Sequence, residues 1–132
     1  MKTFTIATSK QTQFIPLDSY IQQFVHETGV KNGIVCVYIP HTTAGITINE
    51  NADPDVLHDI EQILDKLVPW YGNYRHVEGN SSAHVKASIM GSSVQIIVQN
   101  EKLVLGTWQS IFFCEFDGPR TRKFFVEIIP AP

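Results

Sequence analysis

The 132-residue sequence predicts a single α+β domain whose mostly antiparallel strands form a sandwich-like core. Three observations favour this class: two stretches with helical spacing in the first half, several short alternating stretches, and tight turn signals between them. Strands that follow one another through short turns usually pair with each other, and such pairs are antiparallel. A chain of this length can form a hydrophobic core without disulfide or metal cross-links, so we expect one domain spanning residues 1–132.

The composition is typical of a soluble globular domain and excludes several classes of protein. The chain is 43% hydrophobic and 17% charged, with a net charge of −3, so we expect no nucleic-acid or anionic membrane partner. It has no long apolar run and no N-terminal signal segment, which favours a cytoplasmic location. Cys36 and Cys114 lie inside apolar runs and are expected to be buried free thiols.

The first third of the chain predicts strands at 2–6 and 12–14, then a helix. The helix begins at Asp18, a favourable N-cap residue, and ends before Gly29. Its apolar face is indicated by Leu17, Ile21, Phe24 and Val25, which have helical spacing. Residues 34–39 are apolar and β-branched, as in a strand that is buried on both faces.

Residues 41–49 predict a half-buried strand with a hydroxyl-rich face. The polar residues of the alternation are His41, Thr43, Thr47 and Asn49, and the apolar ones are Ala44, Ile46 and Ile48. A second helix then begins at Asp53–Pro54 and ends at Pro69. Its apolar stripe consists of Val56, Ile60, Ile63, Leu64 and Leu67.

The second half predicts four more strands, giving roughly eight strands and two helices in all. Residues 84–90 alternate, with His84, Lys86 and Ser88 on the polar face. Strands at 94–98 and 103–116 are joined by a turn at Asn100–Glu101, and the last strand covers 122–129. The aromatic stretch within 103–116 exceeds what one small core needs, so part of it is expected to contact other subunits.

The segment RHVEGNSSAHVKAS (75–88) carries two histidines, His76 and His84, at the ends of a polar loop. Together with His41 they offer three imidazoles, a common ligand number for a divalent transition metal that keeps an open position. Glu50 is placed to act as a general base or additional ligand. The alternative is three surface histidines on loops. His26 and His58 are expected to be ordinary helix residues.

The same region also suits a bound anion. On one strand face, His84, Lys86 and Ser88 would present cationic and hydroxyl groups to a phosphate or carboxylate. The loop around Asn80 can add backbone N–H donors, and Arg120 suits bidentate anion recognition. The alternatives are a solvated edge strand at 84–90 and a surface ion pair at Arg120.

Four segments carry a resemblance to a known family: HTTAGITINENADPDV (41–56), NSSAH (80–84), SSVQIIVQNEKLVLGTWQSI (92–111) and EFDGPRTR (115–122). They resemble the YjbQ-like family, also called the secondary thiamine-phosphate synthase family, over about residues 3 to 129. One departure is Glu101, which stands in the hairpin turn where the family pattern has a glycine.

The resemblance implies a sandwich-like homotrimer with a polar cleft. The cleft residues it implies are His41, Thr43, Asn49, Glu50, His76, His84 and Gln109. It also implies an activity that joins a pyrimidine methyl diphosphate to a thiazole phosphate, so the expected partners are a small phosphorylated metabolite and other copies of the chain.

The identity of the metal stays open at this point, because histidine ligands suit zinc whereas diphosphates usually bind magnesium. That mismatch leaves room for a second function, a metal-dependent hydrolase of a phosphorylated small molecule. A third possibility is a non-catalytic module that binds a metabolite in the same cleft.

Overall fold

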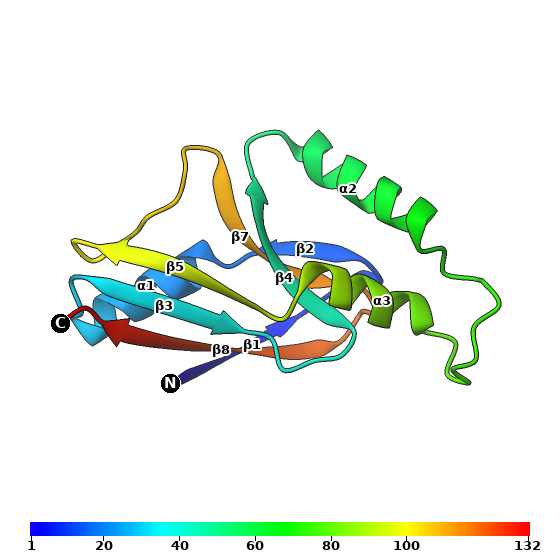
Figure 1. Ribbon diagram of the computed structural model, residues 1–132, viewed down its shortest axis with the longest axis horizontal. Helices are drawn as coiled ribbons and strands as arrows, with labels where there is room; N and C mark the ends of the chain where they lie inside the picture. The colour runs from blue at the N-terminus through cyan, green and yellow to red at the C-terminus, as the bar shows by residue number, and fades with distance from the viewer.

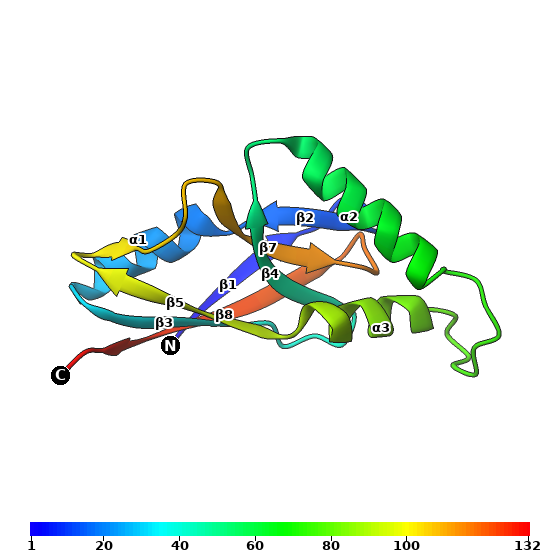
Figure 2. The same ribbon diagram turned by 45° about the horizontal axis from the view of Figure 1, so that its top comes forward.

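The computed structural model describes residues 1–132 as two antiparallel sheets and three helices, which confirms the predicted α+β class. The first sheet has the order β1-β8-β3-β5-β6 and the second has the order β2-β7-β4. Both views place α1 at one end of the molecule and place α2 and α3 at the other end (Figures 1 and 2). The strands are β1 (Lys2–Ala7), β2 (Gln13–Pro16), β3 (Gly33–Tyr38), β4 (Ala44–Glu50), β5 (Ser93–Gln99), β6 (Lys102–Leu103), β7 (Gln109–Glu115) and β8 (Thr121–Pro130). The helices are α1 (Asp18–Thr28), α2 (Pro54–Leu67) and α3 (Ser81–Met90).

The main core lies between the two sheets and is closed by α1. It contains 16 buried residues, including Val35 of β3, Ile46 of β4 and Phe113 of β7. From α1 it receives Ile21, Phe24 and Val25. The helix is fixed to β7 because the Asp18 carboxylate accepts hydrogen bonds from Ser110 Oγ and Ile111 N, each at 2.7 Å.

A second core covers the opposite face of β7. Alternate residues of this strand point in opposite directions, so Phe112 and Cys114 face away from the main core. They pack with Leu64 of α2 and with Ala83 and Ala87 of α3. Because β7 is buried on both faces, its apolar run is uninterrupted. Helix α1 packs in the main core and α2 packs in the second core, so the two helices lie on different sides of the sheet that contains β7.

The prediction of a strand at 84–90 is wrong, because residues 81–90 form α3. The alternating pattern is short, and its small residues satisfy helical spacing equally well: Ala83 and Ala87 are four apart and both are buried. Close packing of α3 on β4 selects the helix. A Cβ placed on Gly45 would lie only 2.8 Å from the Gly91 carbonyl oxygen, so β4 has no side chain at the contact point.

Two strand boundaries also differ from the sequence expectation. Residues 41–43 precede β4 as an irregular segment, since the strand begins at Ala44. The predicted strand at 103–116 is divided, because β6 ends at Leu103 and β7 begins at Gln109. The interruption is stabilised by Gln109, whose Oε1 accepts a hydrogen bond from Gly106 N at 2.7 Å. None of the three helices has the length and apolarity needed to cross a bilayer.

Candidate functional site

A buried ion pair between Arg122 of β8 and Glu115 of β7 connects the two sheets beside the predicted site. Glu115 is fully buried and Arg122 is only 4% exposed. Arg122 Nε donates to Glu115 Oε1 at 2.8 Å, and its Nη2 donates to Oε2, so the pair is bidentate. Thr8 Oγ1 donates to the same carboxylate at 2.8 Å. Both carboxylate oxygens of Glu115, and Nε and Nη2 of Arg122, are therefore engaged within the protein.

The ion pair also orders the segment that carries His41. Arg122 Nη2 donates to Thr43 Oγ1 at 2.8 Å, and Thr43 O accepts a hydrogen bond from Phe116 N at 3.2 Å. Burial by itself would raise the pKa of Glu115, but hydrogen bonds from Arg122 and Thr8 outweigh burial and hold that pKa below its usual value. The carboxylate consequently stays ionised and keeps Arg122 aligned with Thr43.

His41 is held as a neutral imidazole. Its Nε2 accepts a hydrogen bond from Lys123 N at 2.9 Å. Burial lowers the pKa of His41, and the positive charge of Arg122 lowers it further. A neutral ring that accepts at Nε2 carries its proton on Nδ1. His41 therefore offers Nδ1–H as a hydrogen-bond donor.

His84 and His76 form a contact pair on the other side of the site. His84 lies in the first turn of α3, and His76 lies in the exposed loop between α2 and α3. Their ring centroids are 5.3 Å apart, and the rings meet edge to face with an interplanar angle of 89°. The helix thus positions one imidazole, and that imidazole contacts the other.

The three histidines line one polar cavity of about 430 Å³, here called the histidine cavity. Apart from Pro40, all its lining residues are polar or charged: His41, Thr42, Thr43, His76, Glu78, Asn80, His84, Arg120 and Arg122. The prediction that His41, His76 and His84 share one site is therefore consistent with the fold. Its charged side chains are Glu78 and two arginines, and each arginine is ion-paired, Arg122 with Glu115 and Arg120 with Asp117. The cavity therefore suits an anionic ligand through its hydrogen-bond donors and not through a net positive charge.

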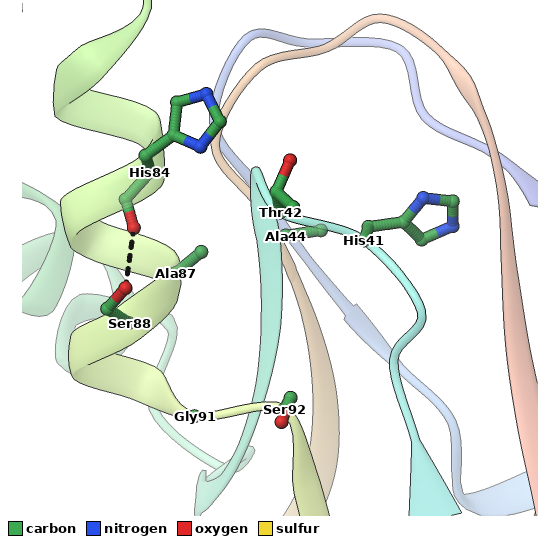
Figure 3. A pocket seen from close by; sticks show the side chains of 8 residues that line it. All are labelled: His41, Thr42, Ala44, His84, Ala87, Ser88, Gly91 and Ser92. Carbon is green, nitrogen blue, oxygen red and sulfur yellow. Dashed lines mark hydrogen bonds between the residues drawn. The ribbon is translucent and has the colours of Figure 1, made fainter.

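A neighbouring cleft of about 500 Å³ lies between α3 and the 41–44 segment (Figure 3). His41 and His84 line both spaces, and Ser88 lines only this one. Figure 3 shows His84 projecting from α3 toward the 41–44 segment, whereas His41 projects from that segment away from α3. The Ser88 hydroxyl donates to the His84 carbonyl oxygen at 3.0 Å, so it is engaged with its own helix.

Arg120 and Asn80 both meet Asp117 at the edge of the histidine cavity. Arg120 Nη2 and Asn80 Nδ2 donate to Asp117 Oδ2 at 2.8 and 2.9 Å. Arg120 Nε also donates to Asp117 O, which leaves Nη1 for a ligand. Asn80 Oδ1 is buried and has no hydrogen-bond partner. A buried acceptor without a partner is costly, so this corner of the cavity suits a donor group or a bound water.

The three histidines of one chain do not form a metal centre in this arrangement. No group of three His, Cys, Asp or Glu side chains is placed to hold a metal ion. His41 Nε2 is occupied by the Lys123 backbone N–H, and its ring points away from α3. These residues therefore do not fit a three-histidine zinc site, and the cavity's donors are better matched to an anion.

Comparison with known proteins identifies the family. Residues 2–131 match the family described as UPF0047 protein YjbQ-like. The chain belongs to the YjbQ-like family. A UPF0047 protein of Methanocaldococcus jannaschii is 53% identical over 126 residues, which cover 96% of this chain and 91% of that relative. The UPF0047 protein YugU of Bacillus subtilis is 49% identical over 130 residues, which cover 98% of each chain.

Solved structures of YjbQ-like proteins have the same fold. An uncharacterised YjbQ/UPF0047 family protein of Clostridium acetobutylicum superposes with a TM-score of 0.96 at 59% identity, covering 98% of this chain and all of that one. A hypothetical protein of Aeropyrum pernix gives a TM-score of 0.92 at 35% identity, covering 98% of each chain. These relatives carry no named activity, so the reaction has to be argued from the site.

Lys86 does not share a face with His84, contrary to the strand prediction. Residues two apart lie on the same side of a strand but about 200° apart around a helix. In the YjbQ-like fold Lys86 is 3% exposed, and its Nζ pairs with Asp65 of α2. The anion site predicted from His84, Lys86 and Ser88 on one strand face is therefore wrong for Lys86.

Asn49, Glu50 and Gln109 lie far from the histidine cavity within one chain. Ala44 begins β4 and Glu50 ends it, and Glu50 is the strand-pairing partner of Gln109 of β7. Glu50 lies six residue steps along β4 from Ala44, a distance of roughly 20 Å at about 3.3 Å per residue. A role for these three residues beside the histidines thus requires a second copy of the chain.

Glu115 and Glu78 are site residues that the sequence patterns do not predict, whereas Arg122 stands in the same turn as Arg120 and offers a second guanidinium there. Glu78 lines the histidine cavity from the same loop as His76. Glu115 ends the apolar run IFFCE, and a carboxylate there implies a buried cationic partner. Arg122 is seven residues away across a turn, so that signal was present in the sequence.

We predict that Arg122→Met lowers the free energy of unfolding by about 3–5 kcal/mol, because it leaves a buried carboxylate without its cation. Urea denaturation measures the change. Adding Glu115→Leu should recover a large part of the loss, since the unpaired charge is then removed. A single variant as stable as the parent protein would show that the pair does not stabilise the fold.

The His41 environment predicts a pH dependence that NMR can measure. The ring should titrate below 6.5 and show the Nδ1–H tautomer above that pH. The unfolded chain protonates His41 at a higher pH than the folded protein does. Protonation of His41 should therefore lower the free energy of unfolding as pH falls from about 6.5 toward the folded-state pKa. A folded-state midpoint at or above 6.5 would contradict the assigned hydrogen bond and charge environment.

Proposed function

We propose that the histidine cavity binds the phosphate or diphosphate group of a small metabolite, and that the protein is an enzyme of the secondary thiamine-phosphate synthase type. The observation that carries this proposal is that His41, His76, His84 and Arg120 line one cavity. Its side chains supply hydrogen-bond donors for phosphate oxygens, and its volume falls in the range of small-molecule sites.

The donors of the cavity have defined sources. Arg120 offers the N–H groups of Nη1, because its Nε and Nη2 are already engaged with Asp117. His41 offers Nδ1–H because its Nε2 accepts from the backbone. His84 and His76 face this space from the opposite side. Donors on two sides of a phosphate group both orient it and stabilise its charge.

The proposed reaction needs charge stabilisation and positioning, with no protein nucleophile. The bond between the pyrimidine methylene carbon and the diphosphate oxygen breaks, and its electron pair leaves with pyrophosphate. The lone pair of the thiazole nitrogen forms the new bond to that carbon. Donors such as Arg120 and His41 stabilise the developing charge on the leaving group. The absence of a serine or cysteine nucleophile from the cavity lining agrees with this chemistry.

A divalent ion, zinc or magnesium, remains a separate proposal. A metal-dependent hydrolase would need at least one ligand from another copy or from substrate, because no three suitable side chains of one chain converge. Phosphate oxygens of a bound diphosphate are the usual ligands that accompany magnesium. The geometry therefore favours the transferase over the hydrolase.

The homotrimer is also proposed, and the outer face of the five-stranded sheet supports it. Ile34 of β3 is paired with Ile97 of β5 and Ile129 of β8, and all three are exposed. On the same face Tyr38 stacks on Phe125 with ring centroids 6.2 Å apart. An exposed apolar surface of this kind is typical of a subunit interface. An assembly would also allow Glu50 of one copy to approach the histidines of another.

The test of the anion site is pyrophosphate binding measured by isothermal titration calorimetry. Arg120→Gln should weaken binding at least tenfold, because the charge-assisted contact from Nη1 is lost. His84→Asn should weaken binding and reduce turnover of the pyrimidine diphosphate and thiazole phosphate. Both variants should keep the parent protein's melting temperature within a few degrees, since both side chains are partly exposed.

The matched control is Arg75→Gln, because Arg75 is exposed in the same loop as His76 and lines none of the cavities described above. It should bind pyrophosphate as the parent does. Equal affinities for the parent, Arg120→Gln and Arg75→Gln proteins would contradict the proposed site. Binding without any turnover would favour the non-catalytic module.

A further inference from the structure

A second polar cavity lies on the other side of α3 from the histidine cavity and is called here the α2–α3 cavity. Its volume is about 650 Å³, and it is bounded by α2, α3, the loop after α2 and the β1–β2 connection. Its charged residues are Lys10, Glu61, Asp65 and Lys86, and its aromatic residues are Trp70 and Tyr71. None of these six residues lines the histidine cavity.

Lys86 forms the buried wall of this cavity. Its side chain is only 4% exposed, and its Nζ has one polar partner, Asp65 Oδ1, at 2.5 Å. An ammonium group has three N–H donors, so two remain without a protein acceptor. Burying a charged group with incomplete hydrogen bonding is costly. A ligand acceptor in the cavity would complete the hydrogen bonding of Lys86.

The remaining charges of the cavity have no partners in the fold. Glu61 lies one helical turn before Asp65 on α2 and makes no ion pair or side-chain hydrogen bond. Lys10 on the opposite rim also has none. The cavity therefore contains two positive and two negative groups, of which only Lys86 and Asp65 neutralise each other. A ligand that pairs with the others needs both signs of charge.

We propose that the α2–α3 cavity binds a small zwitterion of the amino-acid class with an apolar or aromatic side chain. The ligand carboxylate accepts hydrogen bonds from Lys86 Nζ and Lys10 Nζ, and the ligand ammonium pairs with Glu61. Its side chain packs on Trp70, which is half-buried against the second core. This site is independent of the proposed phosphate chemistry, because it uses the opposite face of α3.

The competing explanation is a structural ion pair that fastens α2 to α3 and binds nothing. That explanation accounts for Asp65 and Lys86, and it treats Glu61 and the exposed Lys10 as solvated charges with no role in binding. The two explanations differ in one respect that can be measured. A ligand site requires Glu61 for binding although Glu61 holds no element in place, whereas a structural pair is indifferent to Glu61.

The experiment follows the fluorescence of Trp70 in full-length Trp108→Phe protein, since Trp108 is 63% exposed and is the only other tryptophan. L-Phenylalanine and L-leucine are titrated and should change the signal saturably. Phenethylamine lacks the carboxylate, and 3-phenylpropionate lacks the ammonium. Each should bind at least tenfold more weakly than L-phenylalanine, because each loses one charge-assisted contact.

Glu61→Gln is the deciding variant, since it removes the ammonium partner without disturbing the buried pair. It should weaken L-phenylalanine binding at least tenfold, and Lys86→Met should abolish it. Asp59→Asn and Lys66→Met are the matched controls, because both residues lie on α2 outside the cavity. Both variants should bind L-phenylalanine as tightly as the parent protein does. If Lys86→Met fails to fold, Glu61→Gln still decides the question.

Three results would overturn the proposal. The first is the absence of a saturable signal with either amino acid. The second is binding that Glu61→Gln leaves unchanged. The third is equally tight binding of inorganic phosphate, which would mean that the lysines alone attract any anion. Loss of pyrophosphate binding at the histidine cavity would not affect the result, so the two proposals can fail separately.

Discussion

The buried ion pair between Arg122 and Glu115 is the interaction on which the histidine cavity depends. It joins β8 of one sheet to β7 of the other, and the same guanidinium binds Thr43 and so orders the segment that carries His41. Its positive charge also contributes to the lowered pKa of His41. One interaction thus positions an imidazole and, together with burial, keeps it neutral. These two effects offset part of the cost of burying two charged groups.

Helix α3 is the second determinant of function, because it divides the polar residues of one short segment between two cavities. His84 faces the histidine cavity, while Lys86 faces α2 and Asp65. The division is possible because small side chains at Gly45, Ala83 and Ala87 allow the helix to pack closely on the sheet. This chain therefore has two chemically distinct polar spaces, one lined by the histidines and one lined by lysines and carboxylates.

Much of this arrangement follows from the sequence, and the failures have physical causes. The fold class, α1 and α2 were predictable from periodicity, capping and turn residues. The grouping of His41 with His76 and His84 came from their number as candidate ligands and from the family resemblance, and the three line one cavity. The helix at 81–90 was not, since these ten residues, rich in Ala and Ser, satisfy strand and helix spacing alike, and only packing on β4 decides. The family resemblance implied Glu50 and Gln109 as cleft residues, yet within one chain this strand pair lies at the end of β4 that is farthest from the histidine cavity.

The most direct test of the central claim is a crystal structure of the protein grown with pyrophosphate. The diphosphate should lie in the histidine cavity, with phosphate oxygens within hydrogen-bond distance of Arg120 Nη1 and the His84 ring. Such a complex would also show whether another copy contributes Glu50 to the same site. A diphosphate bound reproducibly elsewhere, with the histidine cavity containing only solvent, would contradict the account.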